Sequence, residues 1–351
     1  MAFDLSRTLV IGISSAALFD MSESDGLFRK LMAEDRQHAI QRYREYMLAH
    51  ENEHLEPGTG YPLVSALLGL NRFGTHDDPV PLVEVVIMSR NSPETGFQVL
   101  NTIRNDRLAI TRSAFTGGEP VSGYIRAFDV DLFLTTNIED AQSVIDSGSC
   151  AVAILRDPPE TVRTVSKEQV RLAFDGDAVL FSEESELVYK TQGLDAFQKM
   201  EDEKQDIPLA EGSYATFLKK LAALQEKLNK SGNGSSIRIA LVTSRNSPSE
   251  MRVIKTLRSW GVHIDEAFFL GGVDKTSVLT AFNPHIFFDD QDIHLEKAEQ
   301  LVPSGKVPYS SRSPFSGNRY TVLEPKWRQA DSPVVQEKHN KPKEPVASQG
   351  S

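Results

Sequence analysis

The chain has 351 residues, of which 40% are hydrophobic and 25% are charged, an ordinary composition for a globular protein with a large core. Its formal net charge of −11 and its pI of about 5.3 argue against a nucleic-acid polymer as a partner, because the chain encodes no basic surface. No apolar run reaches membrane-spanning length and the single cysteine, Cys150, excludes an intrachain disulfide, so we expect a cytoplasmic protein without membrane association.

Strand and helix patterns alternate along the first half of the chain. The first seven residues carry charges of both signs, unlike a signal peptide, and the apolar run at 8–13 predicts a buried strand. Residues 26–48 place apolar side chains at helical spacing, which predicts an amphipathic helix. Further strands are predicted at 82–88, 131–134 and 151–155, and a further helix at 97–103.

The second half follows the same plan. Strands are predicted at 170–174, 237–242, 267–270 and 285–288, and helices at 250–260, at 275–282 and within the charged segment 183–230. Because strands alternate with helices, we expect an α/β fold with a doubly wound parallel sheet covered on both faces. From about residue 326 the tail is rich in Pro, Lys, Gln and Ser, which predicts disorder.

Short sequence segments of the first half recur in the second half. Residues 89–93 read SRNSP and recur at 244–248, an offset of 155 (244 − 89). Four further landmarks keep the same order at similar offsets: residues 17–19 with 179–181, Leu55 and Gly58 with Leu209 and Gly212, Gly117-Gly118 with Gly271-Gly272, and Ala127-Phe128 with Ala281-Phe282. Ordered landmarks at nearly constant spacing indicate an internal duplication.

The duplication predicts the domain organisation. We expect a degenerate α/β half at residues 1–165, a catalytic half at 166–325 with a helical cap insertion at about 183–230, and a tail at 326–351. Ionisable residues differ between the halves in five aligned pairs: Asp175 with Ile13, Asp177 with Ser15, Lys275 with Val121, Asp289 with Thr135, and Asp290 with Thr136. Because the ionisable member always lies in the second half, we expect the chemistry there.

These groups follow the predicted strands of the second half: Asp175-Gly176-Asp177 the first strand, Thr243-Ser244 the second, Lys275 the third, and Asp289-Asp290 the fourth. The carboxyl ends of parallel strands meet at one edge of a sheet, where such folds bind ligands. We therefore expect these side chains to lie close together.

The residue types suit phosphoryl transfer. Asp175 can attack phosphorus as a nucleophile, and Asp177 can act as acid and base if its pKa lies above its ordinary value of about 3.9. Asp175, Asp289 and Asp290 supply the oxygen ligands that Mg²⁺ prefers. A threonine hydroxyl and a lysine ammonium can bind the phosphate oxygens.

Each group also has an ordinary structural explanation. An Asp-Gly-Asp sequence is a common turn, the Asp-Asp and Thr-Ser pairs suit helix N-caps, and Lys275 suits an exposed helix. Their combination at four strand ends, together with their absence from the duplicate, favours the chemical interpretation. Cys150 has no partner cysteine and is predicted to be a small buried hydrophobic residue.

The groups resemble the four motifs of the haloacid-dehalogenase (HAD) superfamily, whose first motif, Asp-x-Asp-x-(Thr/Val), is met by Asp175, Asp177 and Val179. Longer stretches at 174–182 (FDGDAVLFS), 255–261 (KTLRSWG) and 284–291 (PHIFFDDQ) resemble the cytosolic 5′-nucleotidase type I family. The resemblance covers about residues 8–312. It implies an Mg²⁺-dependent hydrolase of nucleoside 5′-monophosphates, typically AMP or IMP.

The resemblance also implies a role for each residue. Asp175 is expected to be the nucleophile and a metal ligand, and Asp177 the acid and base and a metal ligand through its carbonyl group. The remaining residues fall into two sets: Asp289 and Asp290 complete the metal site, while Gly176, Thr243, Ser244 and Lys275 hold the phosphate. The segment at about 183–230 stands where related enzymes carry a cap that closes over the substrate.

Three questions stay open. The chain is alternatively a phosphatase of a non-nucleotide phosphomonoester, or a nucleotide-binding regulatory protein without turnover. The first half is either a scaffold that buries one flank of the catalytic half, or it contributes Ser89, Arg90, Asn91 or the loop at 51–60 to nucleoside binding. The oligomeric state is also open, a homo-oligomer included.

Overall fold

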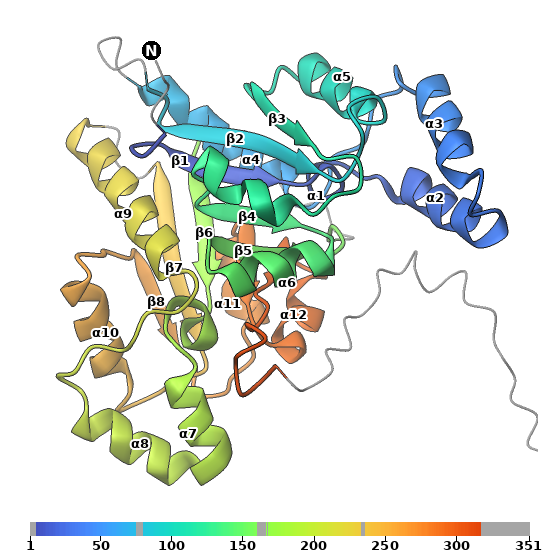
Figure 1. Ribbon diagram of the computed structural model, residues 1–351. Coiled ribbons are helices and arrows are strands. Elements are labelled where there is room, and N and C mark those ends of the chain that lie inside the picture. The colour runs from blue at the N-terminus through green and yellow to red at the C-terminus, as the bar shows by residue number, and fades with distance from the viewer. Residues whose placement is uncertain (1–4, 75–79, 160–165, 167, 233–235, 317–351) are drawn as a thin grey trace, which may run out of the picture.

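Ten strands form one continuous sheet in the computed structural model, which describes residues 5–74, 80–159, 166, 168–232 and 236–316 (Figure 1). The strand order is β3-β2-β1-β4-β5-β10-β9-β6-β7-β8. Adjacent strands run parallel except β5 and β10. The α/β class and the mostly parallel sheet are therefore confirmed, whereas the predicted tail at 326–351 lies outside the described residues.

The first half supplies five strands and the helices between them. The strands are β1 (Leu9–Ile13), β2 (Val83–Ser89), β3 (Arg112–Phe115), β4 (Leu132–Thr135) and β5 (Ala151–Leu155). The helices are α1 (Ser15–Leu18), α2 (Ser22–Glu34), α3 (Ala39–Ala49), α4 (Tyr61–Gly69), η1 (Leu70–Phe73), α5 (Phe97–Asn105), η2 (Val121–Phe128) and α6 (Ile138–Ser147).

The second half supplies the other five strands. These are β6 (Val170–Phe174), β7 (Ile237–Thr243), β8 (Glu266–Phe269), β9 (Ile286–Asp289) and β10 (Ser304–Lys306). Its helices are η3 (Gly176–Leu180), α7 (Glu184–Gln192), α8 (Leu194–Glu203), α9 (Ala215–Lys230), α10 (Glu250–Ser259), α11 (Thr276–Phe282) and α12 (Asp292–Ala298). Each strand predicted from the sequence lies within one or two residues of its observed position.

Helices cover both faces of the sheet, so its inner strands are mostly apolar; every residue of β1, β2 and β5 is buried. On one face a single hydrophobic cluster runs across both halves beneath α4, α5, α9 and α10. On the other face two separate clusters lie beneath η2 and α6 in the first half and beneath α11 and α12 in the second. The two halves therefore share one core on one side of the sheet.

The two half-sheets have the same internal order. Strands β1 to β5 are arranged 3-2-1-4-5, and β6 to β10 repeat that arrangement from the other end of the sheet. The last strands meet antiparallel, with Gly305 opposite Leu155 and Lys306 opposite Ile154. This order agrees with the duplication inferred from the sequence, which remains a hypothesis about origin.

Hydrogen bonds at equivalent positions follow the same pattern in the two halves. The matched bonds are Gly58 N to Leu18 O and Gly212 N to Leu180 O, and Leu55 N to Thr102 Oγ1 and Leu209 N to Thr256 Oγ1. The two glycines allow a close approach of backbones: a Cβ atom on Gly212 would lie 2.4 Å from the carbonyl oxygen of Phe181. This contact explains why glycine occupies both landmarks.

The hydrogen bonds also correct the predicted alignment by one residue. Ser14 N donates to Leu134 O as Asp175 N donates to Phe288 O, so Ser14 rather than Ile13 occupies the position of Asp175. By the same criterion Ser89, which ends β2, occupies the position of Thr243, which ends β7, rather than that of Ser244.

The second half has one extra residue in the turn after its first strand. In the first half Phe19 N donates to Ser15 O, an α-helical turn, whereas in the second half Phe181 N donates to Gly176 O, a wider π-helical turn. Within that turn Ala178 has a φ of 58°, a conformation that non-glycine residues rarely adopt. Such turns are frequent at functional sites, which agrees with the place of Asp177 in this one.

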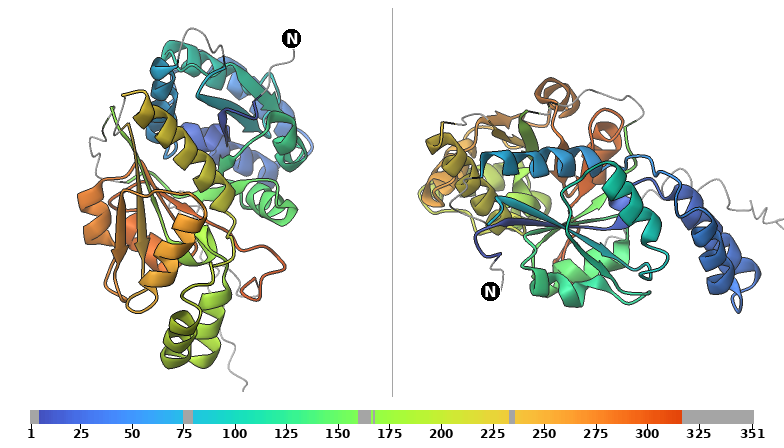
Figure 2. Two further views of the ribbon diagram at one scale, coloured as in Figure 1. Left: turned by 90° about the vertical axis from the view of Figure 1, so that its left-hand side faces the viewer. Right: turned by 90° about the horizontal axis from the view of Figure 1, so that it is seen from above.

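Two helical predictions need correction. The segment 26–48 is not one helix, because the chain leaves helical geometry at Asp35 and begins α3 at Ala39. The segment 183–230 divides into two parts with different positions. Helices α7 and α8 form a hairpin that projects beyond the sheet, whereas α9 packs its apolar side into the shared core beside β1 (Figure 2). Among the described helices, none combines the length and the apolar character needed to cross a membrane.

Candidate active site

Three buried carboxylates meet at the carboxyl edge of the second half-sheet. Asp175 follows β6, Asp289 is the last residue of the neighbouring strand β9, and Asp290 comes directly after it. One carboxylate oxygen from each residue lies within 4.8 Å of the other two. The structure therefore brings together three of the four predicted metal-binding residues.

Lys275 lies between two of these carboxylates. Its Nζ atom is 2.8 Å from Asp175 Oδ1 and 2.7 Å from Asp289 Oδ2, and its side chain is 2% exposed. The residue precedes α11, at the position predicted from the sequence, and is neither solvent-exposed nor a surface helix lysine. The ordinary explanation for this lysine is therefore wrong.

Asp290 is held from the other side by residues that the sequence did not indicate. The hydroxyl group of Tyr309 donates to Asp290 Oδ2 and also lies 3.2 Å from Glu186 Oε2 on α7. The other oxygen, Asp290 Oδ1, is buried and makes no hydrogen bond within the described residues. A buried carboxylate oxygen without a hydrogen-bond donor, on a residue that lies beside two further carboxylates, suits a cation.

The segment that carries Tyr309 rests on the first half. Gln142 Nε2 on α6 donates to Tyr309 O at 3.1 Å, and Asp146 Oδ1 accepts from Ser311 N at 2.7 Å and from Ser310 Oγ at 3.1 Å. The first half therefore contacts the candidate site indirectly, through the residue that orients Asp290.

The charge balance of the cluster is unfavourable without a cation, since its three carboxylates share one lysine, which contacts only Asp175 and Asp289. Burial raises the pKa of Asp175 to about 6, with added repulsion from Asp289 and Asp177 and opposition from Lys275. Burial and the charges of Asp289, Asp175 and Glu186 raise the pKa of Asp290 well above its ordinary range. Burial also opposes the ionisation of Asp289, but Lys275 and His294 outweigh it and lower that pKa. A divalent cation would compensate this excess of negative charge.

We predict that Mg²⁺ binding releases protons. The cation binds carboxylates, whereas Asp175 and Asp290 have raised pKa values and hold protons more readily than ordinary aspartates. The apparent affinity for Mg²⁺ should therefore rise as the pH increases through about 6. Titration calorimetry at pH 6 in buffers of different ionisation enthalpy measures the protons released.

The matched control for this prediction is Asp290→Asn, which removes one titrating ligand and should reduce both the affinity and the proton release. A binding heat that is independent of the buffer would contradict the prediction.

The predicted phosphate-binding residues lie beside this cluster. Thr243 ends β7, next to β6, and its Oγ1 atom would be 3.3 Å from a Cβ atom on Gly176. Ser244, the next residue, is exposed. Thr243 and Gly176 therefore lie against each other at neighbouring strand ends, where a side chain in place of Gly176 would be crowded.

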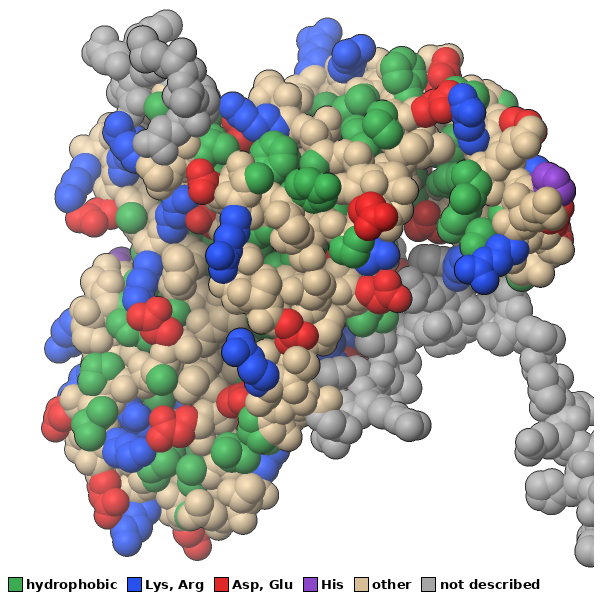
Figure 3. Space-filling model, viewed as in Figure 1, with side chains coloured by type: hydrophobic (Ala, Val, Ile, Leu, Met, Phe, Trp, Pro, Cys, Tyr) green, Lys and Arg blue, Asp and Glu red, His purple; other side chains and the backbone are tan. Residues whose placement is uncertain are grey.

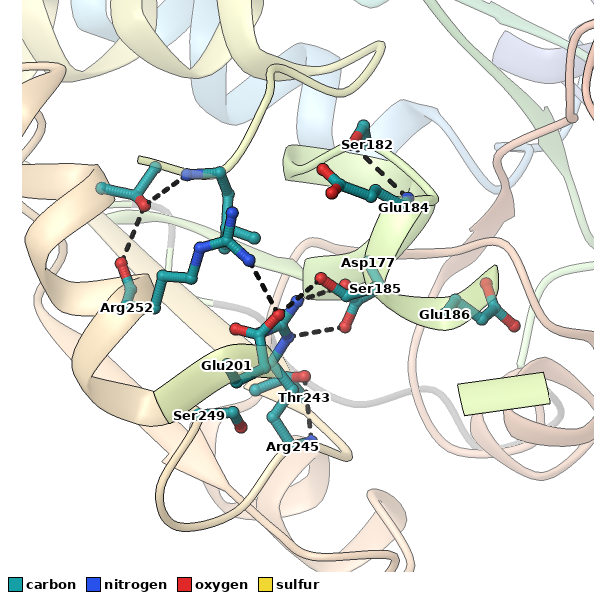
Figure 4. Close-up of polar contacts among 12 residues, drawn as sticks. Asp177, Ser182, Glu184, Ser185, Glu186, Glu201, Thr243, Arg245, Ser249 and Arg252 are labelled. Atoms are coloured by element: carbon teal, nitrogen blue, oxygen red, sulfur yellow. Dashed lines mark hydrogen bonds and ion pairs between the residues drawn. The ribbon is translucent and has the colours of Figure 1, made fainter. Parts of the chain in front are cut away.

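The carboxylate of Asp177 lies outside the three-carboxylate cluster because Arg245 binds it. Arg245 Nε is 2.7 Å from Asp177 Oδ2, and its Nη2 is 2.6 Å from Asp177 Oδ1 (Figure 4). Arg245 also binds Glu201 on α8, with Nη1 2.7 Å from Glu201 Oε2. Sequence reasoning missed both residues; the only signal was that Arg245 belongs to the repeated SRNSP segment.

Residues of the first half that were candidates for nucleoside binding make contacts within the first half instead. Arg90 Nε and Nη2 lie 3.0 Å and 2.8 Å from the two oxygens of Asp140, and Thr59 Oγ1 in the loop 51–60 donates to Arg156 O. Cys150 packs against the first-half core, and burial raises its pKa to about 12, so little thiolate forms at neutral pH. These contacts favour a scaffold role for the first half.

The surface around these elements is mixed in charge. On the face drawn in Figure 3, basic and acidic side chains are interspersed, including over the projecting lower end of the molecule.

Comparisons with known proteins agree with the geometry. A family model described as 5′-nucleotidase matches residues 1–314. Cytosolic 5′-nucleotidase 1B of Homo sapiens is 36% identical over 300 residues, which make up 84% of this chain and 48% of that protein. The chain thus spans about half the length of this curated relative. No solved structure shows a significant match.

Proposed function

This chain belongs to the 5′-nucleotidase family, and from that premise we propose that it hydrolyses nucleoside 5′-monophosphates of the AMP or IMP type to nucleoside and phosphate. The observation that carries the proposal is the buried Asp175–Asp289–Asp290 cluster with Lys275 bound between two of its members. Phosphoryl transfer needs a nucleophile and compensation for negative charge, and the cluster offers both. The name of the human relative supports a cytosolic location.

The reaction divides into two steps at Asp175. A carboxylate oxygen of Asp175 attacks phosphorus and the bond to the nucleoside 5′-oxygen breaks, while Asp177 donates a proton to that oxygen. Asp177 then takes a proton from water, and the water oxygen attacks the aspartyl-phosphate, which releases phosphate and restores Asp175. Lys275, Thr243, Ser244 and the backbone at Gly176 bind the phosphate oxygens in both steps.

The residues present fit Mg²⁺. Asp175, Asp289 and Asp290 would hold it through carboxylate oxygens and Asp177 through its carbonyl, as the unpartnered Asp290 Oδ1 supports. When bound, the cation neutralises enough negative charge for a phosphate dianion to approach the carboxylates.

The α7–α8 hairpin is proposed as the cap. It begins directly after the turn that holds Asp177, and Glu186 on α7 lies at hydrogen-bond distance from Tyr309, the residue that binds Asp290. A hairpin attached at this point can close over the strand ends and exclude all water but the attacking molecule.

A substrate panel tests the proposed function. With Mg²⁺ the purified protein should release phosphate from at least one of AMP, IMP and their deoxy forms, and EDTA should abolish the release. Ribose 5-phosphate is the control, because only a nucleotidase benefits from the base. Inertness toward the whole panel contradicts the proposal, and a higher kcat/KM for ribose 5-phosphate than for AMP favours a sugar phosphatase instead.

A further inference from the structure

Arg245 forms a bidentate ion pair with both carboxylate oxygens of Asp177. The two contacts, 2.7 Å and 2.6 Å, come from Nε and Nη2 of Arg245, the planar side-on arrangement that fixes a carboxylate in one orientation (Figure 4). Each carboxylate oxygen has two acceptor positions, so this grip leaves one on each oxygen for another partner. Asp177 is therefore held in one orientation, with an acceptor position free on each oxygen.

Arg245 is in turn held by the α7–α8 hairpin. Its Nη1 atom lies 2.7 Å from Glu201 Oε2, and its guanidinium carbon lies 5.4 Å from the centre of the Phe197 ring; both residues belong to α8. Ser185 Oγ on α7 donates to Glu201 Oε1 at 2.7 Å. The hairpin therefore contacts Arg245 directly and Asp177 through it.

The chain of ion pairs ends on the body of the protein. Arg252 Nη1 on α10 is 3.0 Å from Glu201 Oε1, and Arg252 Nε donates to Ile207 O. The side chains of Arg245 and Arg252 are 2% exposed and that of Glu201 is 0% exposed. Two cations alternate with two anions, so the buried network is neutral as a whole, and removing one member leaves a buried charge without compensation.

We propose that Arg245 is a positioning residue for Asp177 and that Glu201 couples its position to the α7–α8 hairpin. This inference rests on the proposed function, since it assigns Asp177 the two proton transfers. It predicts that loosening the grip impairs protonation of the leaving oxygen, while attack by Asp175 and binding of the phosphate are preserved.

The test compares two leaving groups in Arg245→Lys. This variant keeps the positive charge that Glu201 and Asp177 need, but an ammonium cannot bind both oxygens side-on. In single-turnover experiments, transfer from AMP, or whichever nucleotide the panel shows to be best, should slow by about 10²-fold, because its alkoxide leaving group needs a proton. Release of nitrophenolate from p-nitrophenyl phosphate should change little, since that group leaves without protonation.

The chain contains its own matched control. Arg90 lies in the first-half copy of the SRNSP segment and binds Asp140 through the same two nitrogen atoms. Neither Arg90 nor Asp140 has a role in the proposed reaction. Arg90→Lys should leave the ratio of the two rates unchanged. Glu201→Gln should shift the ratio in the same direction as Arg245→Lys and should increase hydrogen exchange in α7 and α8.

The outcomes distinguish a failure of the proposed function from a failure of the positioning role of Arg245. A wild-type protein that turns over neither substrate contradicts the proposed function. If the wild type is active but Arg245→Lys slows both substrates equally, or neither, the positioning role is wrong. A calorimetric Mg²⁺ affinity equal to that of the wild type would confirm that the variant retains its folded metal site.

Discussion

Replacement of Asp175 by Asn is expected to abolish turnover, with kcat reduced by about 10⁴-fold or more. The amide nitrogen and carbonyl oxygen of Asn occupy the same volume but provide no carboxylate to attack phosphorus. The fold should survive, because Lys275 keeps its contact with Asp289 and the buried cluster loses a negative charge. Phosphate release from the best nucleotide measures the loss, and thermal unfolding checks the fold.

A mimic of the aspartyl-phosphate intermediate gives this variant a second, independent measurement. Beryllium fluoride imitates a phosphorylated aspartate when it binds a free carboxylate in the presence of Mg²⁺. It should raise the melting temperature of the wild type and leave that of Asp175→Asn unchanged. Equal protection of both proteins would count against a covalent intermediate on Asp175.

Replacement of Lys275 by Met has the second-largest expected effect, and it acts on stability as well as activity. The variant leaves Asp175 and Asp289 buried without their shared cation, which should destabilise the metal-free protein by about 3–5 kcal/mol. Loss of the charge that is proposed to bind phosphate should lower kcat by about 10²- to 10³-fold. Urea unfolding with and without Mg²⁺ measures the first effect, and saturating Mg²⁺ should restore part of the stability.

Lys297→Met is the control for this experiment. Lys297 also binds an aspartate, Asp274 at 2.7 Å, but its side chain is 63% exposed, so loss of that pair should have little effect. Equal destabilisation by the two variants would mean that the buried lysine does not balance the carboxylates.

Much of the site follows from where strands end. An apolar run that is buried on both faces must stop where polar residues begin, so Asp175, Thr243 and Asp289 mark three strand ends in the sequence itself. The topology of a parallel sheet then brings these ends to one edge, as the cluster of carboxylates and Lys275 confirms.

The contacts that support the site leave no such signal. Glu201 reaches Arg245 from a helix 44 positions earlier in the chain, and Tyr309 reaches Asp290 from an irregular segment. These pairings depend on tertiary packing rather than on any local periodicity. The strand β10, only Ser304–Lys306, has no apolar pattern to reveal it, although it joins the two halves.

Local breaks in regular structure were hidden for a similar reason. Residues between α2 and α3 include neither Gly nor Pro. The sequence therefore predicts one continuous helix, although the chain turns at Asp35. The extra residue in the turn after β6 also leaves no mark in the residue pattern. Because of it, the sequence alignment pairs Asp175 with Ile13, whereas in the structure Asp175 occupies the position of Ser14.

The antiparallel pairing of β5 and β10 makes the second half an incomplete unit on its own. Cutting the chain between the halves would expose β10 as a bare edge, open one side of a hydrophobic cluster that both halves fill, and take away the α6 wall against which Tyr309 rests. A freed edge of this kind invites pairing with other chains. Any shortened version of this protein that keeps the second half therefore has to keep the first half as well.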